Sequence, residues 1–273
     1  MAKDYDTIPD VEGGSSPAPE PTFISKLIAE TFGTAVLTQI GCGGLCAALY
    51  LGNAQGTFQC AALWILGATL GVYATGAISG GHLNPAVSFS FALVRPGDFS
   101  FALLLPYIAA QVLGGIIAGC LNYAIYASAI ENYEAGLGDT FIRGSAESIQ
   151  SAAAFGDFYS LSPNVSGWGH AFFIEAFGTA FLTFCIFAVT NPKNNVPSGA
   201  IAPIVGIAIG SMIVMLGNLT GSGINPARDF GPRIALTFFG WGTAAFTNAF
   251  VYIAAPMVGG PIGAFIADNV LFA

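Results

Sequence analysis

The sequence predicts an all-α membrane protein with six transmembrane helices and two re-entrant half-helices, arranged as an inverted repeat. Three observations support this fold class. The chain of 273 residues is 54% hydrophobic and only 8% charged, with a mean hydropathy of +0.70, whereas about a quarter of the residues of a soluble domain are charged. It contains six apolar stretches of membrane-spanning length. The tripeptide Asn-Pro-Ala occurs twice within apolar sequence, at Asn84-Pro85-Ala86 and Asn225-Pro226-Ala227.

The six apolar stretches each approach the length of about 20 residues that a helix needs to cross the hydrocarbon of a lipid bilayer. They lie near residues 25–50, 58–79, 101–125, 169–189, 200–219 and 243–267. The chain also holds 36 glycines, and helices in lipid associate through contacts between small residues. Sequence such as Gly114-Gly115-Ile116-Ile117-Ala118-Gly119 therefore predicts a tight bundle, which we expect to form one domain over residues 23–268.

The N-terminal residues 1–22 are acidic and rich in Pro, Gly and Ser, a composition that predicts a disordered tail. They lack the basic region and apolar core of a signal peptide. We therefore expect the first span to act as the insertion signal, without cleavage.

The basic residues predict how the chain lies in the membrane. An even number of spans with both termini cytoplasmic puts most loop bases inside, as the positive-inside rule requires. The inside bases are Lys3, Lys26, Arg95 and Lys193. Only Arg143 falls outside, in the long outer loop 126–168, where Asn164 begins a glycosylation sequon that can equally stay unmodified. We expect a multi-pass protein of the plasma membrane, since the sequence shows no organelle address.

The chain repeats itself at half its length. Ala29-Glu30-Thr31-Phe32-Gly33-Thr34-Ala35 in the first span recurs as Ile174-Glu175-Ala176-Phe177-Gly178-Thr179-Ala180 in the fourth. Each half, about 23–125 and 169–268, holds three spans and one Asn-Pro-Ala triplet. Because three is odd, the second half is predicted to be inverted relative to the first.

Each Asn-Pro-Ala triplet predicts a helix start, because Asn is a favoured N-cap residue and Pro is best tolerated at the first helical position. The apolar runs that follow, 87–94 and 230–238, are about ten residues long, or roughly 15 Å of helix, which is half a membrane. Irregular backbone at such depth must be buried in protein or line a cavity. We expect the half-helices to meet N-terminus to N-terminus at the midplane, each Asn capping its helix and turning its NH2 toward the axis.

Composition and residue grouping argue against several classes of protein. The net charge of −8 lies largely in the tail and outer loop, and no basic patch indicates nucleic acid. No nucleophile or metal set indicates an enzyme, so we expect no catalysis, metal or cofactor. The cysteines are interpreted as small buried hydrophobes; they are Cys42, Cys46, Cys60, Cys120 and Cys185. A secondary transporter is a distant alternative, because inverted repeats also build transporters, but the triplets offer neutral amides rather than titratable groups.

The two motifs with their flanks resemble the signature loops of the aquaporin and aquaglyceroporin family, the major intrinsic proteins. They read Ser79-Gly80-Gly81-His82-Leu83-Asn84-Pro85-Ala86-Val87 and Gly223-Ile224-Asn225-Pro226-Ala227-Arg228-Asp229-Phe230-Gly231-Pro232. The resemblance extends from about Phe23 to Phe265. It implies an aquaporin-like fold, a passive channel that holds solute in single file, and a homotetramer with one pore per subunit.

The resemblance places Arg228 in the narrowest ring of the pore, with Trp64, Ile213 and Ser222 at the other three positions. An unpaired Arg at membrane depth is costly and a functional candidate, and its charge with the half-helix dipoles repels protons and cations. Trp at the first position is typical of glycerol-conducting and nodulin-26-like channels, whereas water-selective members carry Phe and His at the first two. Trp64 would offer an apolar wall to a polyol, opposite donors from Arg228.

Four further residues resemble the glycerol-facilitator pattern: Asp229, Arg233, Pro256 and Met257. Asp229 is expected to be a structural partner rather than a solute contact. Glycerol facilitators, however, carry Gly in place of Ile213 and Phe in place of Ser222, so the order of glycerol, urea and water stays open. We expect a passive channel for glycerol and other small uncharged solutes that also conducts water and excludes protons and ions. The alternative is a water-selective aquaporin.

The resemblance also implies roles for two buried acids and for the backbone before each triplet. Buried carboxylates are costly unless hydrogen-bonded, and Glu30 and Glu175 are expected to hold this irregular backbone. Its carbonyl groups would then form a polar ladder along the pore. The ladder residues are Gly80, Gly81, His82, Leu83, Gly221, Ser222 and Gly223.

Overall fold

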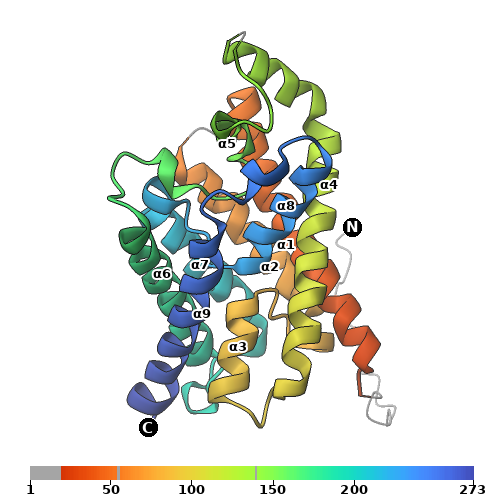
Figure 1. Cartoon of the computed structure of the whole chain (residues 1–273). Coiled ribbons are helices and arrows are strands. Elements are labelled where there is room, and N and C mark those ends of the chain that lie inside the picture. Colours follow the sequence, from red (N-terminus) through yellow and green to blue (C-terminus); the bar gives the residue numbers. More distant parts are fainter. Residues whose placement is uncertain (1–19, 54–55, 139) are drawn as a thin grey trace, which may run out of the picture.

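The computed structural model describes residues 20–53, 56–138 and 140–273, and these ranges consist of helices joined by short connections (Figure 1). No strand occurs within them. The tail predicted to be disordered falls largely on residues 1–19, which lie outside the described residues.

Within the described ranges, six helical segments are long and apolar enough to cross a membrane, as predicted. They are α1 (Phe23–Leu51), α2 (Thr57–Ser79), η1 with α4 (Phe101–Leu103 and Leu104–Gly136), α6 (Trp168–Val189), α7 (Ser198–Thr220), and η5, α9 and η6 (Gly242–Phe246, Ala249–Ile266 and Ala267–Leu271). Two shorter helices, α3 (Pro85–Val94) and α8 (Pro226–Phe238), begin at the two triplets and have 10 and 13 residues. The predicted fold class of six spans and two half-helices is confirmed.

Helix α4 is longer than the third predicted span, which ends near residue 125. Its 33 residues make a rod of about 50 Å, well beyond a hydrocarbon thickness of about 30 Å. The projecting turns are stabilised at Glu134, whose carboxylate accepts a hydrogen bond of 2.6 Å from Arg143 Nη2. The predicted outer loop 126–168, called the outer segment from here on, therefore begins as helix, and it continues through η2 (Ala146–Ser148), α5 (Ile149–Ala152) and η3 (Tyr159–Leu161). On the other side of the bundle, η4 (Pro192–Asn194) joins α6 to α7.

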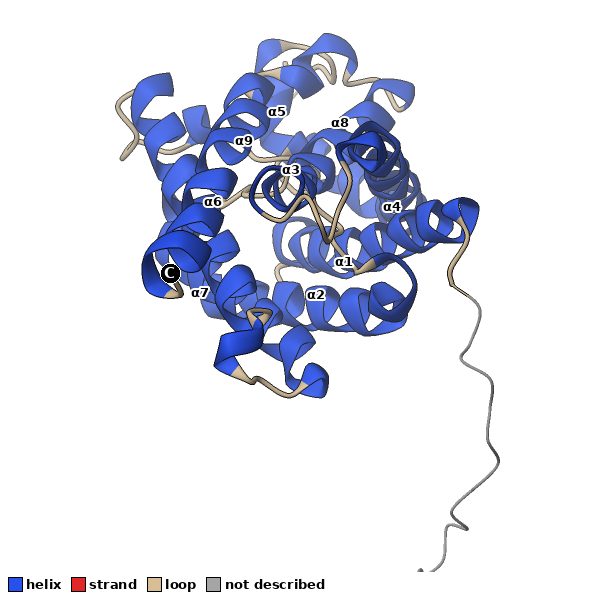
Figure 2. Ribbon diagram, turned by 90° about the horizontal axis from the view of Figure 1, so that it is seen from below, coloured by secondary structure: helices blue, strands red, loops and turns tan. Residues whose placement is uncertain are grey.

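The two halves of the chain interlock through their half-helices. Within each half the spans pack in matching pairs, α1 on α2 and α4, and α6 on α7 and α9. The half-helices cross over, since α3 of the first half packs on α9 of the second and α8 packs on α4. Figure 2 shows α3 near the centre of the bundle with the long helices around it. Each half thus completes the core of the other.

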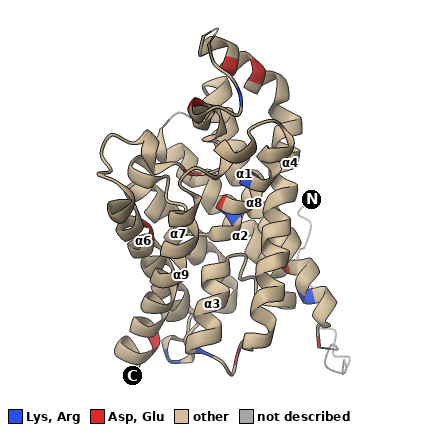
Figure 3. Ribbon diagram, viewed as in Figure 1, with Lys and Arg blue, Asp and Glu red and all other residues tan. Residues whose placement is uncertain are grey.

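Charged residues gather toward the two ends of the bundle, and a few lie in its interior near α8 (Figure 3). The outward faces of the spans instead carry large apolar side chains. Examples are Phe32, Leu105, Phe173, Ile207 and Phe250, which are each 56–75% exposed. Such faces cannot be left to water and fit lipid or a neighbouring subunit.

Glycines let the helix backbones approach closely, both where the halves cross and within each half. Gly231 of α8 faces Gly115 of α4, and a Cβ built on Gly231 would lie 2.7 Å from the Gly115 Cα. Gly114 likewise faces the Thr31 carbonyl of α1, and Gly259 of α9 faces the Ala176 carbonyl of α6. These contacts leave no room for any side chain, in agreement with the predicted small-residue packing.

Replacing Gly231 by Ala should separate α8 from α4. We expect a loss of about 1–3 kcal/mol of stability through overpacking, measured as a lower thermal unfolding midpoint in detergent. Gly199→Ala in α7 is the matched control, because a Cβ there meets no atom within 4 Å. Equal midpoints for the two variants would contradict the close contact.

Candidate pore

The two half-helices begin with the same cap. Asn84 Oδ1 accepts a hydrogen bond of 2.9 Å from the backbone amide of Ala86, and Asn225 Oδ1 accepts one of 3.0 Å from that of Ala227. Both Asn residues have extended backbone, and Pro85 and Pro226 occupy the first helical positions. The side chain satisfies an amide that has no partner within the helix, as expected of an N-cap.

Each capping Asn also binds the opposite half of the chain. Asn84 Nδ2 donates to the carbonyl oxygen of Ile224 over 3.0 Å, and Asn225 Nδ2 donates to that of Leu83 over 2.8 Å. The helix starts therefore meet, as predicted. The prediction that both NH2 groups face the axis is corrected in one respect: one of the two donors of each amide ties the halves together.

Two buried carboxylates hold the irregular backbone before each triplet. Glu30 of α1 accepts hydrogen bonds from the amides of His82 (3.0 Å) and Leu83 (2.8 Å). Glu175 of α6 accepts them from the amides of Gly223 (3.1 Å) and Ile224 (2.7 Å). Both side chains are completely buried.

The backbone at these positions adopts conformations that need such support. Leu83, Ser222 and Ile224 have φ of 52°, 60° and 39°, which is unusual for residues with a side chain. The carboxylates satisfy the amides of these segments, while the carbonyls of Ile224 and Leu83 accept from Asn84 and Asn225. His82 belongs to the support, since its Nδ1 lies 3.1 Å from Ser88 Oγ and its ring stacks on Phe91.

A cavity runs along these elements between the spans. Its polar lining comes from both triplets and from the backbone before them: Gly80, Gly81, His82, Leu83, Asn84, Ser222, Gly223, Ile224, Asn225 and Arg228. Its apolar lining comes mainly from α2, α3, α6 and α7, with residues such as Trp64, Val87, Leu182, Val205 and Ile213. Of the predicted ladder residues, only Gly221 lies outside this lining, and it lines a second pocket together with Asp157, Phe158 and Leu161.

All four predicted ring residues line this cavity. The guanidinium carbon of Arg228 lies 4.2 Å from the ring centroid of Trp64, which is 2% exposed. Ile213 packs in the same apolar cluster as Trp64. Ser222 is also buried, and its hydroxyl has no hydrogen-bond partner among the described residues. The ring thus combines an apolar wall, a guanidinium group and an unsatisfied hydroxyl.

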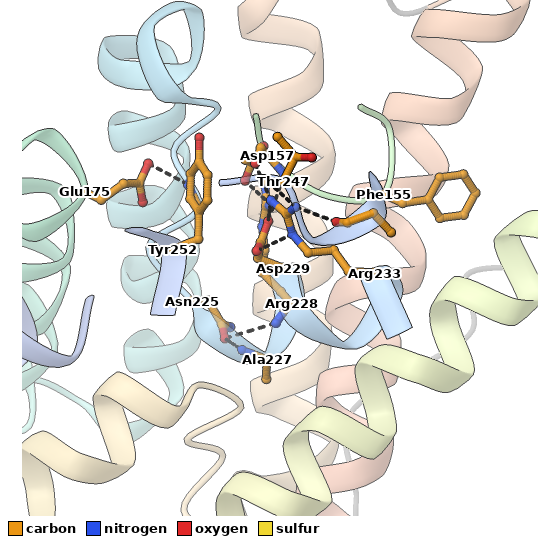
Figure 4. A network of polar contacts seen from close by, with 12 residues as sticks. Phe155, Asp157, Glu175, Asn225, Ala227, Arg228, Asp229, Arg233, Thr247 and Tyr252 are labelled. Carbon is orange, nitrogen blue, oxygen red and sulfur yellow. Dashed lines mark hydrogen bonds and ion pairs between the residues drawn. The ribbon is translucent and has the colours of Figure 1, made fainter. Parts of the chain in front are cut away.

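Arg228 is paired, in contrast to the unpaired Arg considered from the sequence. Its Nη1 donates to Asp157 Oδ2, a carboxylate of the outer segment between α5 and α6 (Figure 4). Burial raises the pKa of the Asp157 carboxyl above its ordinary value, against the opposing effect of Arg228. Sequence reasoning missed Asp157. The available signal is the run 152–158, where this acid stands among apolar residues of an otherwise polar loop.

Asp229 and Arg233 form a frame on α8 rather than a lining of the cavity. They are one helical turn apart, and Arg233 Nε donates to Asp229 Oδ2 over 2.7 Å. Asp229 Oδ1 accepts from the amide of Asp157 (2.8 Å), and Arg233 Nη2 donates to the Asp157 carbonyl (Figure 4). Arg233 Nη1 also donates to the carbonyl of Ala245 (2.7 Å). Both side chains are completely buried, so this frame attaches the outer segment to α8.

The remaining candidate residues lie away from the cavity. Pro256 is buried within α9 and Met257 is half-buried beside it. Asn164 is exposed in the connection before α6. Cys42 and Cys46 are completely buried, and the other three cysteines are half-buried. Within the described part of the chain, no three His, Cys, Asp or Glu side chains gather as a metal site would require.

Replacing Glu30 by Gln should weaken the support of the first half. Gln offers one acceptor oxygen where Glu30 offers two, so a buried backbone amide loses its partner, which costs about 1–3 kcal/mol. We expect a lower thermal midpoint in detergent. Glu131→Gln is the control, because Glu131 is exposed on α4. If both variants unfold at the midpoint of the wild type, Glu30 does not support the backbone.

Comparison with known proteins agrees with this geometry. The sequence profile of the family described as "Major intrinsic protein" matches residues 18–267. The glycerol uptake facilitator protein of Haemophilus influenzae is 38% identical over 243 residues, covering 88% of this chain and 89% of that protein. The protein of the same name from Pseudomonas aeruginosa is 35% identical over 254 residues, covering 90% and 88%.

A solved structure shares the fold. The X-ray structure of the aquaglyceroporin from Plasmodium falciparum matches with a TM-score of 0.78, covering 92% of this chain and 97% of that chain at 24% identity. Since the family profile covers nearly the whole sequence, the chain belongs to the major intrinsic protein family.

Proposed function

We propose that this protein is a passive transmembrane channel for glycerol and other small uncharged solutes. The observation that carries the proposal is the ring in which the face of Trp64 lies against the guanidinium of Arg228 at 4.2 Å. Glycerol has a short carbon chain along one side and hydroxyl groups along the other, so it matches a passage with one apolar and one polar wall. The names of the relatives from Haemophilus influenzae and Pseudomonas aeruginosa support the same solute.

Polar groups along the cavity would replace the water that a solute leaves behind. The Ser222 hydroxyl has no partner among the described residues, and leaving such a buried group unsatisfied costs about 1–3 kcal/mol. A passing hydroxyl group would satisfy it. Further on, the remaining NH2 donors of Asn84 and Asn225 and the carbonyls of the ladder would take over the hydrogen bonds in turn.

Water passage with exclusion of protons and cations is part of the proposal. The N-terminal ends of α3 and α8 meet inside the cavity, and each carries a partial positive charge that opposes cations. Passive transport fits the neutral amides at this meeting point, where an ion-coupled transporter needs ion ligands or titratable groups. Transport of this kind involves no chemistry and no cofactor.

The assembly and orientation are proposed with the function. The large apolar side chains on the outward faces suit a lipid bilayer and subunit contacts, and a homotetramer is the arrangement that the family resemblance implies. Cytoplasmic termini would place the Glu134 and Arg143 pair outside the cell, together with the projecting end of α4. The plasma membrane is the proposed location.

Reconstitution tests the function directly. Proteoliposomes exposed in parallel to osmotic gradients of sucrose and of glycerol, followed by stopped-flow light scattering, should show glycerol entry well above that of empty vesicles. Glycerol entry equal to that of empty vesicles with fast water flow would instead establish the water-selective alternative. Saturable, ion-dependent uptake would establish a secondary transporter.

Replacing Ser222 by Ala tests the polar side of the ring. Loss of one hydrogen bond to the solute, about 0.5–1.5 kcal/mol, should slow glycerol entry about 2- to 10-fold. Ser211→Ala is the matched control, because Ser211 lies on the exposed face of α7, the helix that ends shortly before Ser222, and its hydroxyl donates to the carbonyl of Ile207 in that helix. Unchanged glycerol entry in Ser222→Ala would remove Ser222 from the solute path.

A further inference from the structure

The strongest unassigned feature is an ion pair at the end of the cavity opposite the ring. Arg95 directly follows α3, and its Nε and Nη2 donate to the two carboxylate oxygens of Asp268 in η6 over 2.6 and 2.7 Å. Both side chains are largely buried, at 12% and 15% exposure. A bidentate pair of this kind fixes the direction of a guanidinium group. The end of the first half-helix is thus tied to the turn that follows α9.

The end of α6 completes this cluster. Arg95 Nη1 donates to Thr190 Oγ1 and Nη2 donates to the carbonyl of Phe187, both over 2.8 Å. The guanidinium carbon lies 4.4 Å from the ring centroid of Phe187. Asn191 Nδ2 donates to Asp268 Oδ1 over 2.9 Å. Asp268 therefore holds Arg95 against the end of α6.

The cluster stands beside an opening of the central cavity. Helix α7 runs from Ser198 to Thr220, so Ile201 and Ser222, which both line the cavity, mark its two ends. At the end marked by Ile201 the cavity meets a further space, which we call the inner pocket. Arg95 is among the described residues that line the inner pocket, and Asp268 is not. The cavity and the inner pocket share four lining residues, namely Gly80, His82, Phe91 and Thr190.

The inner pocket carries two acids that would attract the guanidinium if Asp268 did not hold it. Glu20 and Asp98 line this pocket, and neither forms an ion pair with any described residue. A largely buried charge that loses its partner is costly. Without Asp268, Arg95 would therefore be drawn toward these acids and across the space that leads to the cavity.

We propose that Asp268 is a positioning residue that keeps the guanidinium of Arg95 out of the inner pocket and so holds this end of the solute path open. The inference rests on the proposed channel function. A displaced guanidinium would narrow the path, and the donors that Asp268 now occupies would bind the hydroxyl groups of glycerol. Both effects slow the passage of an uncharged solute.

The test is Asp268→Asn in proteoliposomes, with glycerol and water entry measured by stopped-flow light scattering and divided by the amount of protein incorporated. Asn keeps the shape of the side chain and removes its charge. We expect glycerol entry to fall about 5-fold, because the change from a charged to a neutral acceptor shifts an equilibrium by that factor. Asp268→Ala should act in the same direction, and it serves if the Asn variant does not fold.

A double variant separates obstruction by Arg95 from a structural role of the ion pair. Arg95→Ala combined with Asp268→Asn lacks the same pair but has no guanidinium to cross the pocket, so glycerol entry should return toward the wild-type rate. A structural role predicts that the double variant is as slow as Asp268→Asn or slower, and that result overturns the proposal. Unchanged glycerol entry in Asp268→Asn and Asp268→Ala overturns it as well.

Asn269→Ala is the matched control, because Asn269 is the exposed neighbour in the same turn and its side chain donates to the carbonyl of Phe265 one turn earlier. Its glycerol entry should equal that of the wild type. If the wild type conducts water but no glycerol, the glycerol function fails, while slower water entry in Asp268→Asn that recovers in the double variant still supports Asp268. A wild type that conducts neither refutes both.

Discussion

The structure depends on how it satisfies the backbone of two irregular segments deep inside a membrane protein. Hydrocarbon offers no hydrogen bonds, and each unpaired amide there costs several kcal/mol. Glu30 and Glu175 meet this constraint by accepting the amides of His82, Leu83, Gly223 and Ile224. The acids are in turn satisfied, as Glu30 shows with Ser79 and Gln111 at 2.6 and 2.7 Å. The chain can therefore leave its helices at these places without leaving these amides unpaired.

A second constraint joins the two halves. Each half-helix begins inside the bundle, so the polar groups at its start need hydrogen-bond partners there. Asn84 donates to the carbonyl of Ile224, and Asn225 donates to that of Leu83, so each helix start is bonded to the other half. The half-helices also pack on the opposite half, since α3 contacts α9 and α8 contacts α4. Neither half has a complete core without the other, so the cavity at their junction is a product of the whole chain.

The sequence predicts those of these features that appear as a local pattern or as a repeat. Asn and Pro at a helix start, and an acid that recurs with its neighbours in both halves, are visible without coordinates. The length of α4 was not predicted, because hydropathy marks where a helix crosses lipid and not where it ends. Beyond the apolar run, the helix is held by Glu134 with Arg143, a contact that follows from tertiary structure.

The contact of Asp157 with Arg228 likewise follows from tertiary structure, and it changes how the ring is understood. The segment that carries it has no periodic pattern, and its place is set by Asp229 and Arg233 on a distant helix. From the sequence, the ring differs from the glycerol-facilitator pattern only by Ile213 and Ser222. In the structure, Ser222 has a hydroxyl at the cavity without a partner among the described residues, and Arg228 forms an ion pair with Asp157. A guanidinium alone only donates hydrogen bonds. With the hydroxyl of Ser222 beside it, the polar wall gains an acceptor, while the apolar wall of Trp64 is retained. The groups in contact with the ring thus include Asp157, which lies in the segment between α5 and α6 and outside the four predicted ring positions.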